Sequence, residues 1–320
     1  MATINTEFIG ITNLNQSLLM SEIENTLKMF FDWSFLKIGG WTDVTRTDAE
    51  NYYGGDSDVL RYVQDDNYTD GQVWQGHRKD WCWETGVNYT GALNPTVIGN
   101  PYVGGVENTA GHTIDYPNGK LIFTTAVSTS AVVTLSYSYR TVQTYVADSA
   151  PWFQELQWRS LRSDDVQFTQ SSQTGDWSTP NHQRIQLPAV VIECVSRRRQ
   201  TGHELGNNAF DVYQDVVFHV LAENRTDRNN ILDAIAMQDE STIWLLNSDE
   251  IAADETFPLG INGNLLDSTK TYPALVAVTD YQYKKLTFRN MILSEINTFT
   301  PNLHEGIARC SCHVIAGTVN

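Results

Sequence analysis

Four strand-like runs in the second half of the chain most constrain its fold. They span residues 187–195, 210–222, 285–298 and 304–316, and the first two are rich in Val, Ile, Leu and Phe. Runs of this composition and length are typical of β-strands. A polar, glycine-containing stretch joins the first two runs, and the turn Thr300-Pro301-Asn302 joins the last two. We therefore expect two antiparallel hairpins of long strands.

A helix is expected over residues 17–36. Apolar residues recur there at helical intervals, namely Leu19, Ile23, Leu27 and Phe30. Ser21 and Glu24 have the spacing of an N-terminal capping box, and Gly39-Gly40 is expected to stop the helix. Because the helix is apolar on one side, that side must lie against a sheet or another helix.

A second helix is expected over residues 223–237, directly after the strand that ends near Ala222. Its apolar residues are Ile231, Leu232, Ile235 and Ala236, and Asn224 or Thr226 lies near its cap. Residues 242–246 fit either a short strand or a helical turn.

The first half of the chain also contains strand signals. Residues 112–116 and 120–125 flank Pro117-Asn118-Gly119, and Asn-Gly between two such runs predicts a tight hairpin. Residues 131–140 alternate, with Val133, Leu135, Tyr137 and Tyr139 on one side. This pattern indicates a half-buried antiparallel sheet, which we expect to form a small sandwich.

Two segments carry weaker signals. Residues 41–85 interleave Asp with Trp and Tyr, which indicates short strands and loops. The aromatic and acidic side chains from Tyr52 to Trp83 fit the core of a small domain, or a surface on which sugar rings stack. Residues 148–186 are polar and resemble a connection, with one short helix expected near Trp152 to Arg162.

The charge of the chain limits its partners. It has 38 acidic and 21 basic residues, for a net charge of −17. Such a surface repels phosphate backbones and anionic membranes, so we expect nucleic acid only as passing cargo and no membrane binding. The start, Met1 to Glu7, shows no secretory signal, so folding in a cytoplasm is expected. The four cysteines are scattered and read as free thiols.

No enzyme motif was found. Cys310-x-Cys312-His313 lacks the second ligand pair of a zinc site, and its cysteines fit one buried face of a strand. The loop from Asp66 to Asp70 lacks a calcium-binding ligand set. Nucleophile elbows and phosphate-binding glycine loops are missing from the sequence. A carboxylate pair that meets only in space is invisible to sequence. We expect no enzyme, no metal and no cofactor.

Arg197, Arg198 and Arg199 form the only basic run in this acidic chain. We expect them at the tip of the hairpin between residues 195 and 210, where they are candidates for contact with an acidic partner. The alternative is a solvated loop without a partner.

Two stretches resemble proteins of tailed bacteriophages. Residues Ala110 to Val127, AGHTIDYPNGKLIFTTAV, and Val132 to Tyr139, VVTLSYSY, resemble a hairpin that recurs in virion proteins. Residues 187–246 are similar in pattern to tail-terminator and tail-completion proteins, in which a hairpin feeds a helix over a mixed sheet, preceded by an N-terminal helix.

This resemblance implies an α+β, β-rich fold with a mixed or antiparallel sheet and two flanking helices. Residues 1–40 and 180–320 would form this terminator-like core, residues 41–150 an inserted β-sandwich-like domain, and residues 151–179 the connection. Simple terminators lack such an insertion, so the station in the virion stays open between neck, stopper and tail terminator.

The resemblance also implies a function and partners. The protein would be a virion structural protein, made in the host cytoplasm, that forms a ring, commonly a hexamer, between head connector and tail tube. Its partners would be copies of itself and neighbouring neck, connector, tube or sheath proteins, with DNA passing through the ring. The main alternative is a glycan- or receptor-binding virion module.

Overall fold

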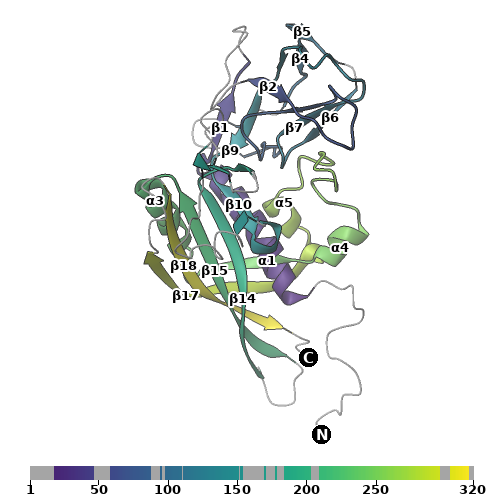
Figure 1. Ribbon diagram of the computed structural model, residues 1–320. Coiled ribbons are helices and arrows are strands. Elements are labelled where there is room, and N and C mark those ends of the chain that lie inside the picture. The colour runs from purple at the N-terminus through teal and green to yellow at the C-terminus, as the bar shows by residue number, and fades with distance from the viewer. Residues whose placement is uncertain are drawn as a thin grey trace.

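The computed structural model describes residues 18–46, 58–87, 94–95, 98–109, 111–150, 152–153, 169–170, 177–178, 184–202, 209–295 and 303–316. The fold is α+β and strand-rich, as the sequence predicts. A long curved sheet with helices makes up most of the molecule, and a smaller assembly of short strands lies at one end of it (Figure 1).

The large sheet has six strands in the order β10-β14-β15-β18-β17-β16. Their bounds are β10 (Gln143–Val146), β14 (Ala189–Gly202), β15 (Phe210–Ala222), β18 (His304–Ala316), β17 (Gln282–Glu295) and β16 (Thr242–Leu246). Of the described strand pairs in this sheet, β10–β14 is parallel and the others are antiparallel. Both predicted long hairpins, β14–β15 and β17–β18, are confirmed, and residues 242–246 are a strand.

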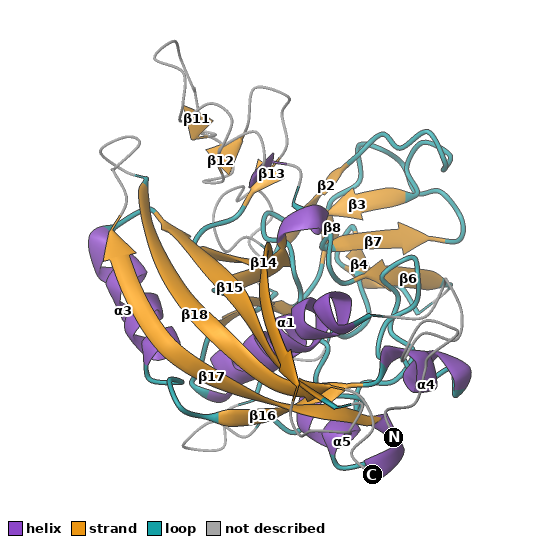
Figure 2. Ribbon diagram, turned by 90° about the horizontal axis from the view of Figure 1, so that it is seen from below, coloured by secondary structure: helices purple, strands orange, loops and turns teal. Residues whose placement is uncertain are grey.

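Two helices, α1 (Leu19–Lys37) and α3 (Arg225–Ala236), cover one face of this sheet, which we call the inner face (Figure 2). The ring of Phe31 on α1 meets Phe218 of β15 with centroids 5.1 Å apart. Leu232 of α3 packs above Gly306 of β18, where any side chain would collide with it. Alternate residues of each strand point into this core, as a period of two requires.

The start of α1 differs from the prediction. The helix begins at Leu19, and its N-cap is Leu18, which makes no side-chain capping bond. Ser21 and Glu24 therefore lie inside the helix, and the predicted capping box is wrong. Glu24 instead accepts a hydrogen bond from the backbone N–H of Cys194 on β14 at 3.0 Å. A contact with the sheet has replaced the local cap.

The other predicted helix ends are confirmed. Gly39 follows α1 with φ of 87°, a backbone conformation that favours glycine. The side chain of Asn224 caps α3 by accepting from the N–H of Asp227 at 2.8 Å. Two short helices, α4 (Ser248–Ala253) and α5 (Tyr272–Val276), pack beside Phe30 of α1.

Described residues between 41 and 140 form the smaller assembly, which we call the β unit. Seven short strands pair in the order β5-β4-β8-β2-β3-β7-β6. Their bounds are β2 (Val59–Tyr62), β3 (Val73–Gln75), β4 (Tyr102–Val103), β5 (Val106–Glu107), β6 (His112–Asp115), β7 (Lys120–Phe123) and β8 (Val133–Thr134). The Asn-Gly hairpin is confirmed as β6–β7, with Gly119 at φ of 60°.

A two-stranded ribbon, β1 (Trp41–Val44) with β9 (Tyr137–Arg140), packs against that sheet and gives the β unit its sandwich-like core. At its centre Trp81 is fully buried and stacks on Tyr137, with ring centroids 4.5 Å apart. Residues 131–140 are not one strand, as predicted, but two: β8 pairs with β2 and β4, whereas β9 pairs with β1.

The β unit ends earlier than residue 150. Strand β10 follows β9 directly and pairs with β14, so residues 143–146 belong to the large sheet. The predicted domain boundary at residue 150 is therefore too late. Residues 258–266, which lie between α4 and α5 in the chain, contact the β unit. The carbonyl of Gly263 accepts a hydrogen bond from the N–H of Tyr116 at 3.0 Å.

The predicted connection, residues 151–179, lies mostly outside the described residues. A helical turn at Trp152 and Phe153 and the small sheet of β11 (Thr169–Gln170), β12 (Trp177–Ser178) and β13 (Arg184–Ile185) are described. Phe153 packs with Ala189, Val191 and Leu221 on the outer face of the large sheet, opposite the helices.

Of the helices described, none has the length and apolar character needed to cross a bilayer.

Candidate assembly surface

One edge of the large sheet is only half covered. Strand β10 pairs with β14 from Ala189 to Ile192. Among the described residues, no strand pairs with the same side of β14 from Val195 to Gly202. This stretch, which we call the basic edge, lies at the end of the sheet away from the β unit (Figure 1). An edge of this length displays backbone groups that can pair with another chain.

The three arginines lie on the basic edge and not in a loop, so their predicted position at the hairpin tip is wrong. Arg198 lies opposite Gln214 and Arg199 opposite Tyr213 in the β14–β15 ladder. Arg197 falls in a register shift between Cys194 and Arg198. The side chain of Gln214 stabilises this bulge by donating to the carbonyl of Val195 at 2.5 Å. Pairing with the long strand β15 keeps this polar run extended.

The alternation of side chains along β14 sends Arg198 and Arg199 to opposite faces of the sheet. Arg199 is exposed on the outer face, with its guanidinium 5.8 Å from the ring centroid of Tyr213. Tyr213 in turn stacks on His313 at 4.7 Å, and His313 Nε2 lies 2.9 Å from Asp211 Oδ1. The strands therefore hold Arg199 at the end of a row of cross-strand contacts.

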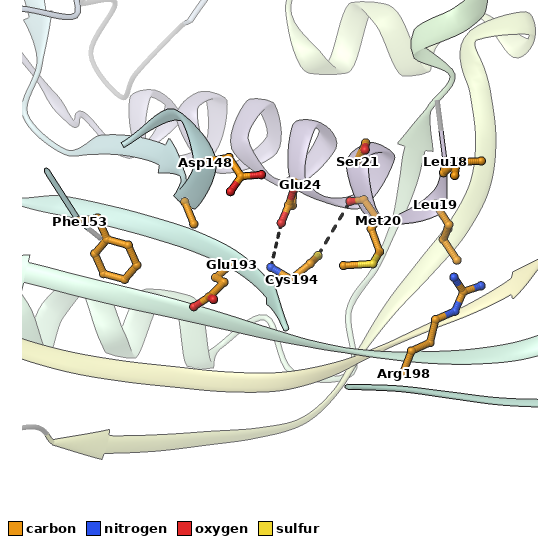
Figure 3. Close-up of a pocket in the computed structure, with 11 residues that line it drawn as sticks. Leu18, Leu19, Met20, Ser21, Glu24, Asp148, Phe153, Glu193, Cys194 and Arg198 are labelled. Carbon is orange, nitrogen blue, oxygen red and sulfur yellow. Dashed lines mark hydrogen bonds between the residues drawn. The ribbon is translucent and has the colours of Figure 1, made fainter. Parts of the chain in front are cut away.

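Arg198 points the other way, into a cleft of about 700 Å³ beside the basic edge (Figure 3). The cleft lies between the start of α1, the 3₁₀ turn η1 (Ala147–Ser149) and β14. Leu18, Leu19 and Met20 supply its apolar wall. Because η1 follows β10 directly, the cleft opens where β10 stops covering β14.

The cleft has a polarised lining. Glu24, Asp148 and Glu193 lie at one end, and Arg198 lies near Leu19 at the other (Figure 3). Burial raises the pKa of Glu24, and the hydrogen bond from the Cys194 N–H opposes this only in part. Burial also raises the pKa of the Cys194 thiol, which therefore stays protonated and is a poor nucleophile. This lining suits a chain segment with apolar and charged side chains.

Glu193 links the cleft to a buried histidine. His219 Nδ1 lies 3.0 Å from Glu305 Oε1, and its Nε2 lies 3.5 Å from Glu193 Oε2. Burial alone would lower the pKa of His219, but the two carboxylates outweigh it and raise the pKa. The three side chains join β14, β15 and β18 beneath the ring of Phe153.

The other sequence candidates are part of the core. Cys310 and Cys312 are buried on the inner face with their sulfurs 3.7 Å apart, and they pack among apolar side chains. Trp74, Trp81 and Trp83 are buried in the β unit. The carboxylate of Asp70 accepts from the hydroxyl of Tyr62 at 2.6 Å. Within the described residues, no group of three or more His, Cys, Asp and Glu side chains is arranged to hold a metal ion.

Sequence reasoning did not find the cleft, because its lining comes from three segments far apart in the chain. The unpaired edge was also invisible, because the length of β10 relative to β14 is a property of the folded sheet. Comparison with known proteins gives no family model, no curated protein and no solved structure that matches this chain.

Proposed function

We propose that this chain is a non-enzymatic structural subunit that assembles with other chains through the edges of its large sheet. The observation that carries the proposal is the basic edge, a long stretch of β14 that none of the described strands pairs with, beside an open cleft. Natural sheets usually shorten or cover such an edge, because it binds other strands. An edge that stays accessible and carries exposed arginines suits a docking partner.

The virion setting of the proposal comes from the sequence resemblance to phage tail-terminator and tail-completion proteins. In that setting the subunits form a ring, commonly a hexamer, between the head connector and the tail tube. The core of a mixed sheet with α1 and α3 on one face supports this assignment. The net charge of −17 also supports it, because a DNA conduit should repel the passing phosphate backbone.

The alternative of a glycan-binding module was based on the aromatic and acidic residues from Tyr52 to Trp83, of which Tyr68 is 39% exposed. Trp74, Trp81 and Trp83 are each less than 10% exposed and form the core of the β unit. Buried rings cannot stack on a sugar, so the described part of the β unit does not favour this alternative.

Electron microscopy of purified protein, alone and mixed with tail tubes, tests the proposal. We expect ring-shaped particles of uniform diameter, or rings seated on the tube ends. Light scattering should give a mass that is a fixed multiple of 36.1 kDa. A strict monomer that binds no tube, connector or neck protein would overturn the proposal.

A further inference from the structure

The opposite edge of the large sheet is also only partly covered, but at its other end. Strand β16 pairs with β17 from Gln282 to Thr287. The turn after α3 then takes over, since the Phe288 N–H donates to the Ser241 carbonyl and the Met291 N–H to Asp239 Oδ1. Among the described residues, no strand covers this side of β17 from Ile292 to Glu295.

The surface around this second edge carries exposed apolar side chains and two carboxylates, with the exposed Arg289 and Arg309 nearby. Ile292 and Leu293 are 63% and 41% exposed, and Met237 at the end of α3 is 82% exposed. Asp239 and Glu240, both exposed, lie beside them. We call these five residues the acidic edge. Exposed apolar residues on a sheet edge are a liability unless something covers them.

The two edges are complementary in charge and in apolar content. The basic edge presents Arg198 and Arg199 beside Leu18, which is 49% exposed, and the cleft wall. The acidic edge presents two carboxylates beside three exposed apolar side chains. Glu240 pairs with Arg289 of its own chain at 2.7 Å, but this ion pair is exposed, so its exchange for an arginine of a second copy costs little. Two basic edges facing each other would bring arginines together, so a symmetric contact through the basic edge is disfavoured.

The strand directions also match. Each neighbouring pair from β14 through β15 and β18 to β17 is antiparallel, so β17 runs antiparallel to β14. Across the sheet, Val191 of β14 lies level with Ser294 of β17, and Gln200 of β14 lies level with Leu286 of β17. The covered part of β14 is therefore level with the open part of β17, and the open part of β14 is level with the covered part of β17. A second copy in the same orientation can pair its β17 with β14 after a stagger along the strands. Closure of a sheet into a barrel requires such a stagger.

The geometry points to a second copy of this chain as the occupant of the basic edge. The end of β17 from one copy adds to β14 of the next as an antiparallel strand, with Asp239 and Glu240 facing Arg198 and Arg199. Leu293 shares the inner face of its sheet with Arg198, so it reaches the mouth of the cleft. This inference rests on the proposed function and specifies its contact. A head-to-tail contact generates a closed ring or a filament.

Charge-reversal variants test this pairing. Arg198→Glu/Arg199→Glu places like charges across every contact, and so does Asp239→Lys/Glu240→Lys. Each variant should lower the association constant at least about tenfold at low salt, measured by sedimentation velocity. The chain with all four substitutions restores opposite charges at each contact and should assemble again. Lys37→Glu/Lys285→Glu lowers the net charge by the same amount as the arginine reversal, at exposed positions outside both edges, and it should assemble like the wild type.

The outcomes separate this inference from the proposed function. A wild-type chain that never associates with itself or a virion partner overturns both. Wild-type assembly that survives both reversals, or that the fourfold variant fails to restore, overturns only the pairing of these edges. Asp239→Lys removes the bond to the Met291 N–H, so Asp239→Asn/Glu240→Gln serves as a milder variant that keeps an acceptor there. This milder variant should also assemble more weakly than the wild type, while its melting temperature stays unchanged. If it assembles as strongly as the wild type, the result counts against the pairing.

Discussion

The backbone N–H of Thr141 donates to the carbonyl oxygen of Gly40 over 2.9 Å. The chain therefore leaves the core at Gly40 and returns to it at Thr141, at adjacent points, and residues 41–140 lie between them. Because the β unit has its own buried core around Trp81, we expect it to be removable. Replacement of residues 41–140 by a short Gly-Ser linker, with Leu36→Gln where the β unit covered α1, should leave a folded core that unfolds cooperatively in urea.

A longer deletion provides the control. Removal of residues 41–147 takes β10 as well, which uncovers β14 from Ala189 to Ile192 and lengthens the open edge. We expect that protein to aggregate, whereas the shorter deletion stays soluble. Insolubility of both proteins would mean that the β unit is required for folding of the core.

Arg140 is the main buried charge at the junction between the β unit and α1. It is 4% exposed, donates to Asp80 at 2.8 Å and pairs with Glu84. Burial raises the pKa of Asp80 to about 6, although Arg140 opposes this. Arg140→Met leaves two carboxylates without their counter-charge, so the free energy of unfolding at pH 7 should fall by about 3–5 kcal/mol.

Urea unfolding measures that loss, and Lys120→Met is the matched control. Lys120 pairs with Asp65 at 3.2 Å at a partly exposed site of the β unit, where an ion pair contributes about 0–1 kcal/mol. Equal, small losses in the two variants would show that water reaches Arg140 and that the junction is not held by this network.

His219 should make stability depend on pH above neutrality. Its pKa is raised in the folded protein by Glu193 and Glu305, against the effect of burial. A raised pKa adds stability that is complete below the unfolded value, about 6.5, and is lost as pH rises through the folded value. Wild type should therefore lose stability above pH 6.5, and His219→Gln should flatten this loss. Urea midpoints between pH 6 and 9 measure it, and parallel curves would contradict the assignment.

The three arginines should matter for assembly and little for folding. Arg198 and Arg199 are exposed, and Arg199 makes one contact with a tyrosine ring. Arg197→Ser/Arg198→Ser/Arg199→Ser should leave the melting temperature nearly unchanged, because exposed charge contacts contribute about 0–1 kcal/mol each. Assembly should slow, most clearly at low salt, where screening is weakest. A large drop in melting temperature, or unchanged assembly rates across a salt series, would contradict this role.

Much of the fold was predictable because its signals are local. The period of the long strands, the Asn118-Gly119 turn and the cap at Asn224 each act over a few residues, and the structure has them where predicted. The β14–β15 hairpin was placed correctly, but its strand was ended too early. Ser196 to Gln200 has the composition of a loop, and only pairing with β15 keeps it extended.

The candidate assembly surface was predictable only in part. The arginine run was visible as a charge anomaly, but its place on a strand edge was not. The capping box at Ser21 and Glu24 failed because Glu24 bonds to Cys194, 170 positions away. The cleft and both half-covered edges depend on which strands are neighbours and how far each extends. Local patterns do not carry that information.

If copies of this chain join head to tail through the basic and acidic edges, strand β14 of one copy lies beside β17 of the next. Cross-linking of variants that each carry one added cysteine tests this pairing, because the native cysteines are all buried. Val195 and Ser294 both point to the outer face, and they lie opposite each other when Asp239 and Glu240 face Arg198 and Arg199. Val195→Cys mixed with Ser294→Cys should form a disulfide-linked dimer under mild oxidation, while neither variant alone should do so. Efficient cross-linking of Val195→Cys with itself, or none in the mixture while rings persist, would show that the edges do not pair in this way.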